Sequence, residues 1–203
     1  MEYVVELGRR ERKRQAVHLS VLEAADRLFA ERGVARTTVD DIAEAADVAR
    51  QTVFNHFAYK EAMALELGAD SIQRVAQHAH ARLEAGAPAL EVLEETAKRM
   101  LDESFQRGEC AAVVAQELLH ADPERASRAA DRVPISALFE AILWQAKEEG
   151  TLREDLPVDI VAKTMSAILT SVVAQIMYTD ANLARRQLKV CFDIWFNGIS
   201  ERS

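Results

Sequence analysis

The chain has 203 residues, of which 49% are hydrophobic and 6% aromatic. Ala, Leu, Glu and Arg dominate, a usage that favours an all-α fold over a strand-rich one. The formal net charge of −8 excludes a uniformly basic, nucleic-acid-coating surface, and no stretch reaches the roughly 20 apolar residues of a membrane span. The N-terminus also lacks the apolar segment of a secretory signal, so we expect a cytoplasmic protein with no membrane contact.

The charge is unevenly distributed along the chain. Residues 1–60 carry ten basic and ten acidic residues, so the whole acidic excess lies downstream. The first part also holds the basic run RRERKR (9–14) and an acid-free stretch from Val48 to Lys60. Such asymmetry is expected when only one end of a molecule meets a polyanion. The basic run is either disordered and solvated, or it reaches a phosphate or the adjacent minor groove.

Glycine and proline divide the chain into about nine predicted helices. Four glycines each follow a segment of apolar helical periodicity, and prolines stand near the start of the next segment, as is typical of helix ends and starts. The first predicted helix, 12–31, ends at Gly33, and Thr38 with Asp41 then fits a capping box that opens a short helix. After a break at 46–48, the remaining predicted helices are 49–56, 59–83, 88–107, 109–120, 125–149 with an interruption at Pro134, 157–179 and 182–199.

Two short helices joined by a turn predict a helix-turn-helix motif, whose second helix enters the major groove of DNA. Val53 and Phe57 have the spacing of a buried face, which leaves the polar side chains of the second helix exposed. Arginine can bind guanine, glutamine and asparagine can bind adenine, and a threonine methyl can contact thymine. The predicted base-reading residues are Arg50, Gln51, Thr52 and Asn55.

Hydroxyls, helix N-termini and a cation at helix ends suit phosphate contacts, which fix the register of a protein on DNA. We assign residues 1–60 to this DNA-binding domain and residues 61–203 to a second, larger helical bundle. Periodicity alone also allows a small solvated helix with its polar residues outside. The predicted phosphate-binding residues are Thr37, Thr38, His56, Tyr59 and Lys60.

The segment LFAERGVARTTVDDIAEAADVARQTVFNHFAYKEAM (28–63) resembles the DNA-binding domain of the tetracycline-repressor (TetR) family of bacterial transcription regulators. The resemblance rests on many positions at the right spacing and covers roughly the first third of the chain. The matching positions are Phe29, Gly33, Thr37-Thr38, Ile42-Ala43, Ala46-Asp47-Val48, His56-Phe57 and Lys60-Glu61.

Four positions depart from that family's pattern. Asp47 replaces the turn glycine, but aspartate tolerates a left-handed backbone better than most residues, so we expect the turn to survive. Gln51 replaces a small residue and adds a candidate base contact. Phe54 replaces a tyrosine, which removes a phosphate-binding hydroxyl, and Tyr59 stands at the usual serine cap of the next helix.

The resemblance implies that residues 61–203 bind a small molecule and supply a dimer interface. The apolar residues of 157–179 cover more than one face, which requires a second packing partner. We expect this helix and 182–199 to form a four-helix dimer interface with their symmetry mates, with a purely intramolecular core as the alternative. The predicted interface residues are Met165, Ile168, Leu169, Val172, Ile176, Cys191, Ile194 and Trp195.

A ligand site in a helical bundle is an apolar cavity with a few polar groups. His78 and His80 diverge on a helix, and the two cysteines lack metal-ligand spacing, so no metal site is predicted. For each candidate pocket residue, ordinary core or surface packing is the alternative. The predicted pocket residues are Met100, Phe105, Glu117, His120, Phe139, Trp144 and Tyr178.

Together these features predict a ligand-responsive, DNA-binding transcriptional regulator. We expect a homodimeric repressor that a small molecule releases from a palindromic operator. The alternatives are a corepressor-dependent or activating regulator of the same fold, and a helical interaction module without DNA binding. The seven glycines lie at least 18 residues apart, which excludes glycine-rich nucleotide and nucleophile motifs. We therefore expect no enzyme activity, no catalytic residue and no cofactor.

Overall fold

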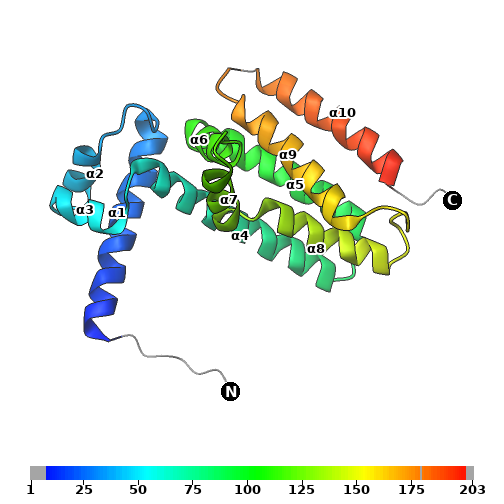
Figure 1. The fold of residues 1–203 in the computed structure, drawn as a ribbon, viewed down its shortest axis with the longest axis horizontal. Helices are drawn as coiled ribbons and strands as arrows, with labels where there is room; N and C mark the ends of the chain where they lie inside the picture. The colour runs from blue at the N-terminus through cyan, green and yellow to red at the C-terminus, as the bar shows by residue number, and fades with distance from the viewer. Residues whose placement is uncertain (1–7, 179, 200–203) are drawn as a thin grey trace.

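The structure is a computed structural model that describes residues 8–178 and 180–199. Figure 1 shows an elongated, helical molecule with the first three helices gathered at one end. Within the described ranges, no helix is long and apolar enough to cross a bilayer. The ten helices of the described residues are α1 (Arg9–Arg32), α2 (Val39–Ala45), α3 (Arg50–His56), α4 (Lys60–Glu84), α5 (Ala89–Arg107), α6 (Glu109–Leu118), α7 (Pro123–Arg132), α8 (Ile135–Glu148), α9 (Val158–Ala174) and α10 (Ala181–Ile199).

The N-terminal domain is a three-helix unit in which α2 and α3 form the predicted helix-turn-helix. Val21, Leu28 and Phe29 of α1 are buried together with Ile42 of α2 and Val53 of α3. Because both short helices have only seven residues, tertiary packing of these apolar residues must supply most of their stability.

The turn between α2 and α3 has the left-handed residue that the sequence predicts. Asp47 has φ +53°, and it is the one non-glycine residue with positive φ among the described residues. The Val48 N–H then donates to the Ala43 carbonyl at 3.0 Å, which closes the turn. The expectation that Asp47 can replace the turn glycine is therefore confirmed.

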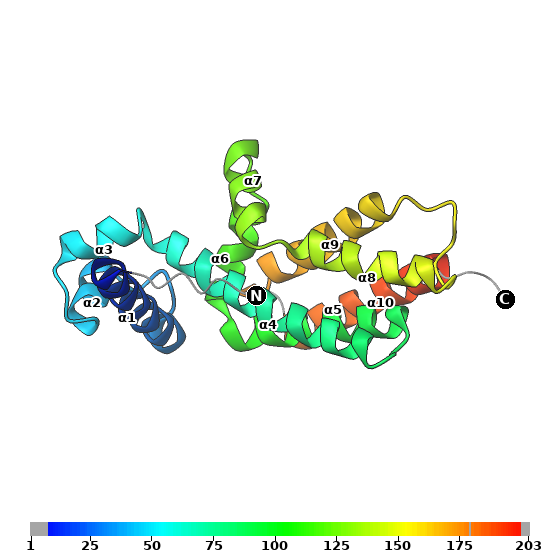
Figure 2. The ribbon, with the colours of Figure 1, turned by 90° about the horizontal axis from the view of Figure 1, so that it is seen from below.

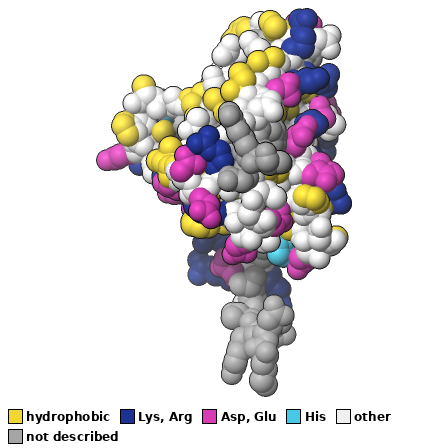
Figure 3. All heavy atoms as spheres, turned by 90° about the vertical axis from the view of Figure 1, so that its right-hand side faces the viewer, with side chains coloured by type: hydrophobic (Ala, Val, Ile, Leu, Met, Phe, Trp, Pro, Cys, Tyr) yellow, Lys and Arg dark blue, Asp and Glu magenta, His cyan; other side chains and the backbone are white. Residues whose placement is uncertain are grey.

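The second domain is a bundle in which α4, α5, α6, α8 and α9 enclose the core. Its largest fully buried side chains include Phe139, Leu143 and Met165. Helix α10 lies against α5 and α9 on the outside of the bundle (Figure 1), and α7 projects sideways (Figure 2). Figure 3, which looks at the end opposite the first domain, shows acidic and basic side chains intermixed, with no large area of one sign.

Two differences from the predicted elements have simple causes. The run RRERKR forms the exposed first turns of α1, because Arg, Lys and Glu are strong helix formers, so the disordered alternative is wrong. Helix α9 ends at Ala174 rather than 179, where the bonds of Gln175 and Ile176 tighten to the i to i−3 pattern. The break at Pro134 separates α7 from α8 as predicted and raises the count to ten.

Candidate DNA interface and candidate ligand cavity

Helix α3 has an apolar side turned into the first domain and a polar side turned to solvent. Val53 and Phe57 are buried, so the helix is held from one side only. The orientation is the one that a major-groove helix requires. Of the predicted base-reading residues, Arg50, Gln51 and Asn55 are exposed and Thr52 is half-buried.

The exposed side chains of α3 are oriented by their neighbours. Arg50 Nη1 lies 2.6 Å from Asp40 Oδ2 of α2, and the guanidinium carbon lies 5.5 Å from the ring centre of Phe54. Gln51 Nε2 donates to Asn55 Oδ1 over a long 3.4 Å. These contacts keep the polar tips at the surface, where arginine and amide groups can form bidentate contacts with base edges.

Two of the predicted phosphate-contact residues, Thr37 and Lys60, bind backbone carbonyls of the chain itself in this structure. Thr37 is 1% exposed, and its hydroxyl donates to the Gly33 carbonyl at 2.7 Å. Lys60 Nζ donates to the carbonyls of Val34 and Thr37, at 2.6 and 3.2 Å, and to that of Ala35 at 3.3 Å. Thr37 therefore binds the carbonyl of the residue that caps α1, and Lys60 binds carbonyls of the loop that follows α1.

The three other predicted phosphate contacts lie closer to solvent. Thr38 is exposed but forms the predicted capping box, since its hydroxyl accepts from the Asp41 N–H and Asp41 accepts from the Thr38 N–H. Hydrogen bonds from the side chain and backbone of Thr38 also lower the pKa of Asp41. Tyr59 is exposed, with the Arg125 guanidinium 6.0 Å from its ring centre. His56 is half-buried at the end of α3.

His56 belongs to a cluster that joins three helices. The His18 ring of α1 stacks on Phe57 at 4.6 Å and lies 5.5 Å from the His56 ring. His18 Nε2 also lies 2.5 Å from Glu66 Oε1 of α4. Burial lowers the pKa of His56, and the electrostatic influence of His18 and Arg14 lowers it further. The cluster places titratable groups between the recognition helix and the helix that leads into the bundle.

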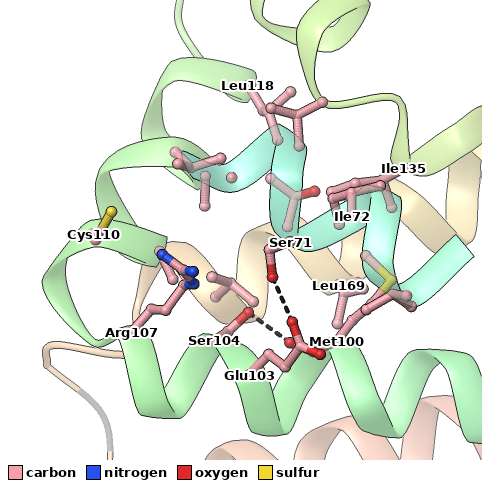
Figure 4. A pocket seen from close by; sticks show the side chains of 18 residues that line it. Ser71, Ile72, Met100, Glu103, Ser104, Arg107, Cys110, Leu118, Ile135 and Leu169 are labelled. Atoms are coloured by element: carbon pink, nitrogen blue, oxygen red, sulfur yellow. Dashed lines mark hydrogen bonds between the residues drawn. The ribbon is translucent and has the colours of Figure 1, made fainter. Parts of the chain in front are cut away.

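The candidate ligand cavity lies inside the bundle, between α4, α5, α6 and α9 (Figure 4). The atom-free space inside it, including its opening to solvent, is about 600 Å³. Burial raises the pKa of the Cys110 thiol at its edge to about 11, so this cysteine is a neutral wall residue. The apolar wall is formed by Ile72, Val75, Met100, Val114, Leu118, Val133, Ile135, Leu169 and Val173.

Most polar groups of the cavity lie where α5 ends, and Thr170 of α9 lines it as well. Glu103, Ser104 and Arg107 come from its last turns, and Ser71 of α4 faces them (Figure 4). Ser71 Oγ donates to Glu103 Oε2 at 2.5 Å, and Arg107 Nη1 donates to Asp26 Oδ1 of α1 at 3.1 Å. An apolar space with polar groups on one side suits a ligand with a hydrocarbon part and a polar end.

Six of the seven predicted pocket residues lie away from this cavity, and only Met100 lines it. Glu117 is buried but forms a bidentate ion pair with Arg125, and Phe139 is packed in the core. The His120 ring accepts from the Asp122 N–H in the loop before α7. The other three side chains contact or face the outside: Phe105 lies under Arg185, Trp144 is half exposed beside Lys147, and Tyr178 is 86% exposed.

The predicted dimer residues divide into two groups. Met165 and Leu169 are buried in the core of the chain itself, and Leu169 lines the cavity, so for them the intramolecular alternative is correct. Ile194 is 66% exposed, and Leu183 and Val190 continue an exposed apolar stripe along α10. Ile176 is almost fully buried, whereas Ile168, Val172, Cys191 and Trp195 are half-buried.

Both domains match known families. Residues 21–67 match bacterial regulatory proteins of the tetR family, and residues 69–198 match the C-terminal domain of TetR/AcrR family transcriptional repressors. The two matches meet at residue 68, inside α4 (Lys60–Glu84), the helix that runs from the first domain into the bundle.

Individual relatives agree with these matches. The transcriptional repressor KstR2 from Mycobacterium tuberculosis is 32% identical over 144 residues, which cover 70% of this chain and 72% of KstR2. The regulator TtgR from Pseudomonas putida is 42% identical over 64 residues, and the match spans only 30% of its length. The crystal structure of the repressor FadR from Thermus thermophilus with lauroyl-CoA has a TM-score of 0.76 at 26% identity, covering 86% of this chain and 92% of FadR.

Proposed function

Because this chain belongs to the TetR/AcrR family of transcriptional repressors, we propose that it is a homodimeric repressor that an acyl-chain effector releases from a palindromic operator. The effector class is a long acyl chain with an oxygen-bearing polar end, such as a thioester of coenzyme A. The observation that carries the effector class is the cavity with a largely apolar wall, whose two charged groups, Glu103 and Arg107, both lie at the end of α5.

The first domain supports operator recognition through α3. Arg50, Gln51 and Asn55 are exposed on a helix that Val53 and Phe57 hold from behind. We assign base contacts to Arg50, Gln51, Thr52 and Asn55, and each well-formed bidentate pair adds on the order of 1–3 kcal/mol of discrimination. Thr38 and Tyr59 remain the exposed candidates for phosphate contacts.

The cavity supports an acyl chain more than a compact polar effector. Its wall is made of branched aliphatic side chains from four helices, whereas its charged groups, Glu103 and Arg107, both come from the end of α5. FadR from Thermus thermophilus, which shares this fold, was crystallised with lauroyl-CoA. A hydrocarbon tail would therefore bury its surface in the bundle, and its polar end would face α5.

The bundle also supports a dimer. The apolar stripe Leu183, Val190 and Ile194 on α10 is exposed in the single chain, and such a stripe is typical of a helix that packs on a second copy. Two copies related by a twofold axis can present their α3 helices to successive major grooves, about 34 Å apart.

The proposal can be tested with an operator selected from random DNA and fluorescence anisotropy. We expect lauroyl-CoA to weaken operator binding, whereas coenzyme A without an acyl chain has no effect. Arg50→Ala with Gln51→Ala should abolish specific binding and leave the circular dichroism spectrum and the dimer unchanged. Tighter operator binding with lauroyl-CoA would contradict release, and specific binding by the double variant would contradict the role of α3.

A further inference from the structure

Arg107 both lines the candidate ligand cavity and contacts the first domain. Its side chain lines the cavity, and its Nη1 donates to Asp26 Oδ1 of α1 at 3.1 Å. The two side chains are unequally exposed, at 24% for Arg107 and 49% for Asp26. This ion pair therefore connects the wall of the candidate ligand site to the DNA-binding domain directly.

A second contact lies two residues further along the chain. Glu109 Oε1, at the start of α6, accepts from the Ala35 N–H at 2.8 Å in the loop that joins α1 to α2. The fit is close, since a Cβ on Gly33 would lie 1.9 Å from Glu109 Oε2 and Gly33 has φ +83°. The other side of the loop is held by Lys60, which is the first residue of α4.

The two contacts form one mechanical unit, which we call the interdomain joint: Asp26 with Arg107, and Ala35 with Glu109. Arg107 and Glu109 are separated only by Gly108, which has φ +51° and joins α5 to α6 without a break. A movement of Arg107 toward the cavity therefore also shifts the turn at Gly108, and with it Glu109. Of the joint residues, Arg107 lines the cavity, near Cys110 (Figure 4).

A guanidinium has five N–H donors, and its charge favours carboxylate, phosphate or carbonyl oxygen as a partner. Asp26 is half exposed, so its pair with Arg107 is partly screened and easily exchanged. An oxygen acceptor inside the cavity can compete with Asp26 for Arg107, because the attraction between the guanidinium and an oxygen is stronger where water is excluded.

We propose that Arg107 binds an oxygen acceptor at the polar end of the effector, and that this acceptor displaces Asp26 and opens the interdomain joint. The inference rests on the proposed function and adds the group that recognises the effector and transmits its binding. It also sets a chemical requirement: an effector needs both the apolar chain and an acceptor that reaches Arg107. The acceptor is the carboxylate of a fatty acid or an oxygen of an acyl-CoA.

The test uses Asp26→Asn and Glu109→Ala in the full chain, because neither residue lines the cavity. Asp102→Asn is the matched control: it removes the same charge from an exposed pair with Arg185 that joins α5 to α10 and lies outside the joint. Binding of lauroyl-CoA and of laurate is measured by calorimetry. Operator affinity is measured by anisotropy with and without each ligand, and the ratio of the two dissociation constants is the coupling factor.

We expect both joint variants to bind the active ligand at least as tightly as the wild type, with a coupling factor about two- to fivefold smaller, the scale of one partly exposed ion pair. Asp102→Asn should keep the wild-type factor. Activity of laurate assigns the acceptor to a carboxylate, and activity of lauroyl-CoA alone assigns it to the thioester or the phosphates. Wild-type coupling in both joint variants would overturn the inference and leave the proposed function intact. Failure of the wild type to bind either ligand would overturn both.

Discussion

His56 is a half-buried histidine whose surroundings disfavour a positive charge. Removal from water is the main reason that its pKa is lowered, and the electrostatic influence of His18 and Arg14 acts in the same direction. The unfolded chain has no such surroundings, so there His56 titrates near its ordinary value of about 6.5. Between that value and the lower folded-state pKa, the unfolded chain binds more protons than the folded one.

This difference predicts how stability depends on pH. By linkage, the free energy of unfolding falls as the pH drops below about 6.5, because protonation favours the unfolded state. We expect His56→Gln to lose less stability than the wild type between pH 7.5 and pH 5.5. Urea unfolding followed by circular dichroism at the two pH values measures this. His78→Gln, at an exposed position on α4, is the control, and an identical loss in wild type and His56→Gln would contradict the prediction.

Hydrogen bonds from side chains to the backbone explain why the partners of some polar side chains could not be predicted from the sequence. Thr37 and Lys60 carry groups suited to phosphate, and their position near helix ends is correct. Backbone carbonyls at the end of α1 and in the loop after it compete with a DNA phosphate for the same donors, and they lie within hydrogen-bond distance in the chain itself. Arg50 and Gln51 contact side chains of Asp40 and Asn55 instead, and their exposure agrees with the helical periodicity.

At the level of elements, α2 depends on its cap. It has seven residues, and its capping box joins the Thr38 hydroxyl to the Asp41 N–H at 3.1 Å. Short helices are marginal without such support, because few internal hydrogen bonds offset the cost of nucleation.

We expect Thr38→Ala to lower the free energy of unfolding by about 1 kcal/mol, the typical cost of losing a cap. Urea unfolding measures this change. Thr164→Ala is a matched control, since Thr164 is exposed in the middle of α9 and its hydroxyl donates to the Ile160 carbonyl of its own helix. Equal losses in the two variants would show that the cap has no special role.

The elements themselves were largely predictable, and the cavity was not. Gly33, Pro134 and the Thr38 cap mark helix ends by local chemistry, which a sequence displays directly. The cavity wall instead combines residues of α4, α5, α6, α8 and α9, with Val133 between α7 and α8, and each is an ordinary aliphatic side chain in its own segment. Aromatic residues such as Phe139 and Trp144 are conspicuous in the sequence, but Phe139 is packed in the core and Trp144 lies at the surface.

At the level of the molecule, the proposed DNA-binding face and the candidate ligand cavity lie in different domains, and α4 connects the two domains. Helix α4 begins with Lys60, which holds the loop after α1, passes Glu66 beside His18, and then lines the cavity with Ser71 and Ile72. The interdomain joint is a second connection between the two domains, at the end of α5 and the start of α6. An effector in the proposed site would lie beside both connections to the DNA-binding domain, and the coupling factor defined above measures whether its binding acts through them.

The proposed dimer makes a prediction about the whole assembly. Ile194 is the most exposed member of the apolar stripe on α10, so a charge there would have to be buried in the interface without a partner, at a cost of several kcal/mol. We expect Ile194→Glu to be a monomer by analytical ultracentrifugation at a concentration where the wild type is a dimer. Its helical content should be unchanged, because the side chain is already in water within one chain. Operator binding should fall at least tenfold, since a single α3 reads only one half-site. Leu19→Glu changes an exposed leucine on α1 and should remain dimeric, whereas a dimeric Ile194→Glu would place the interface on another face of the bundle.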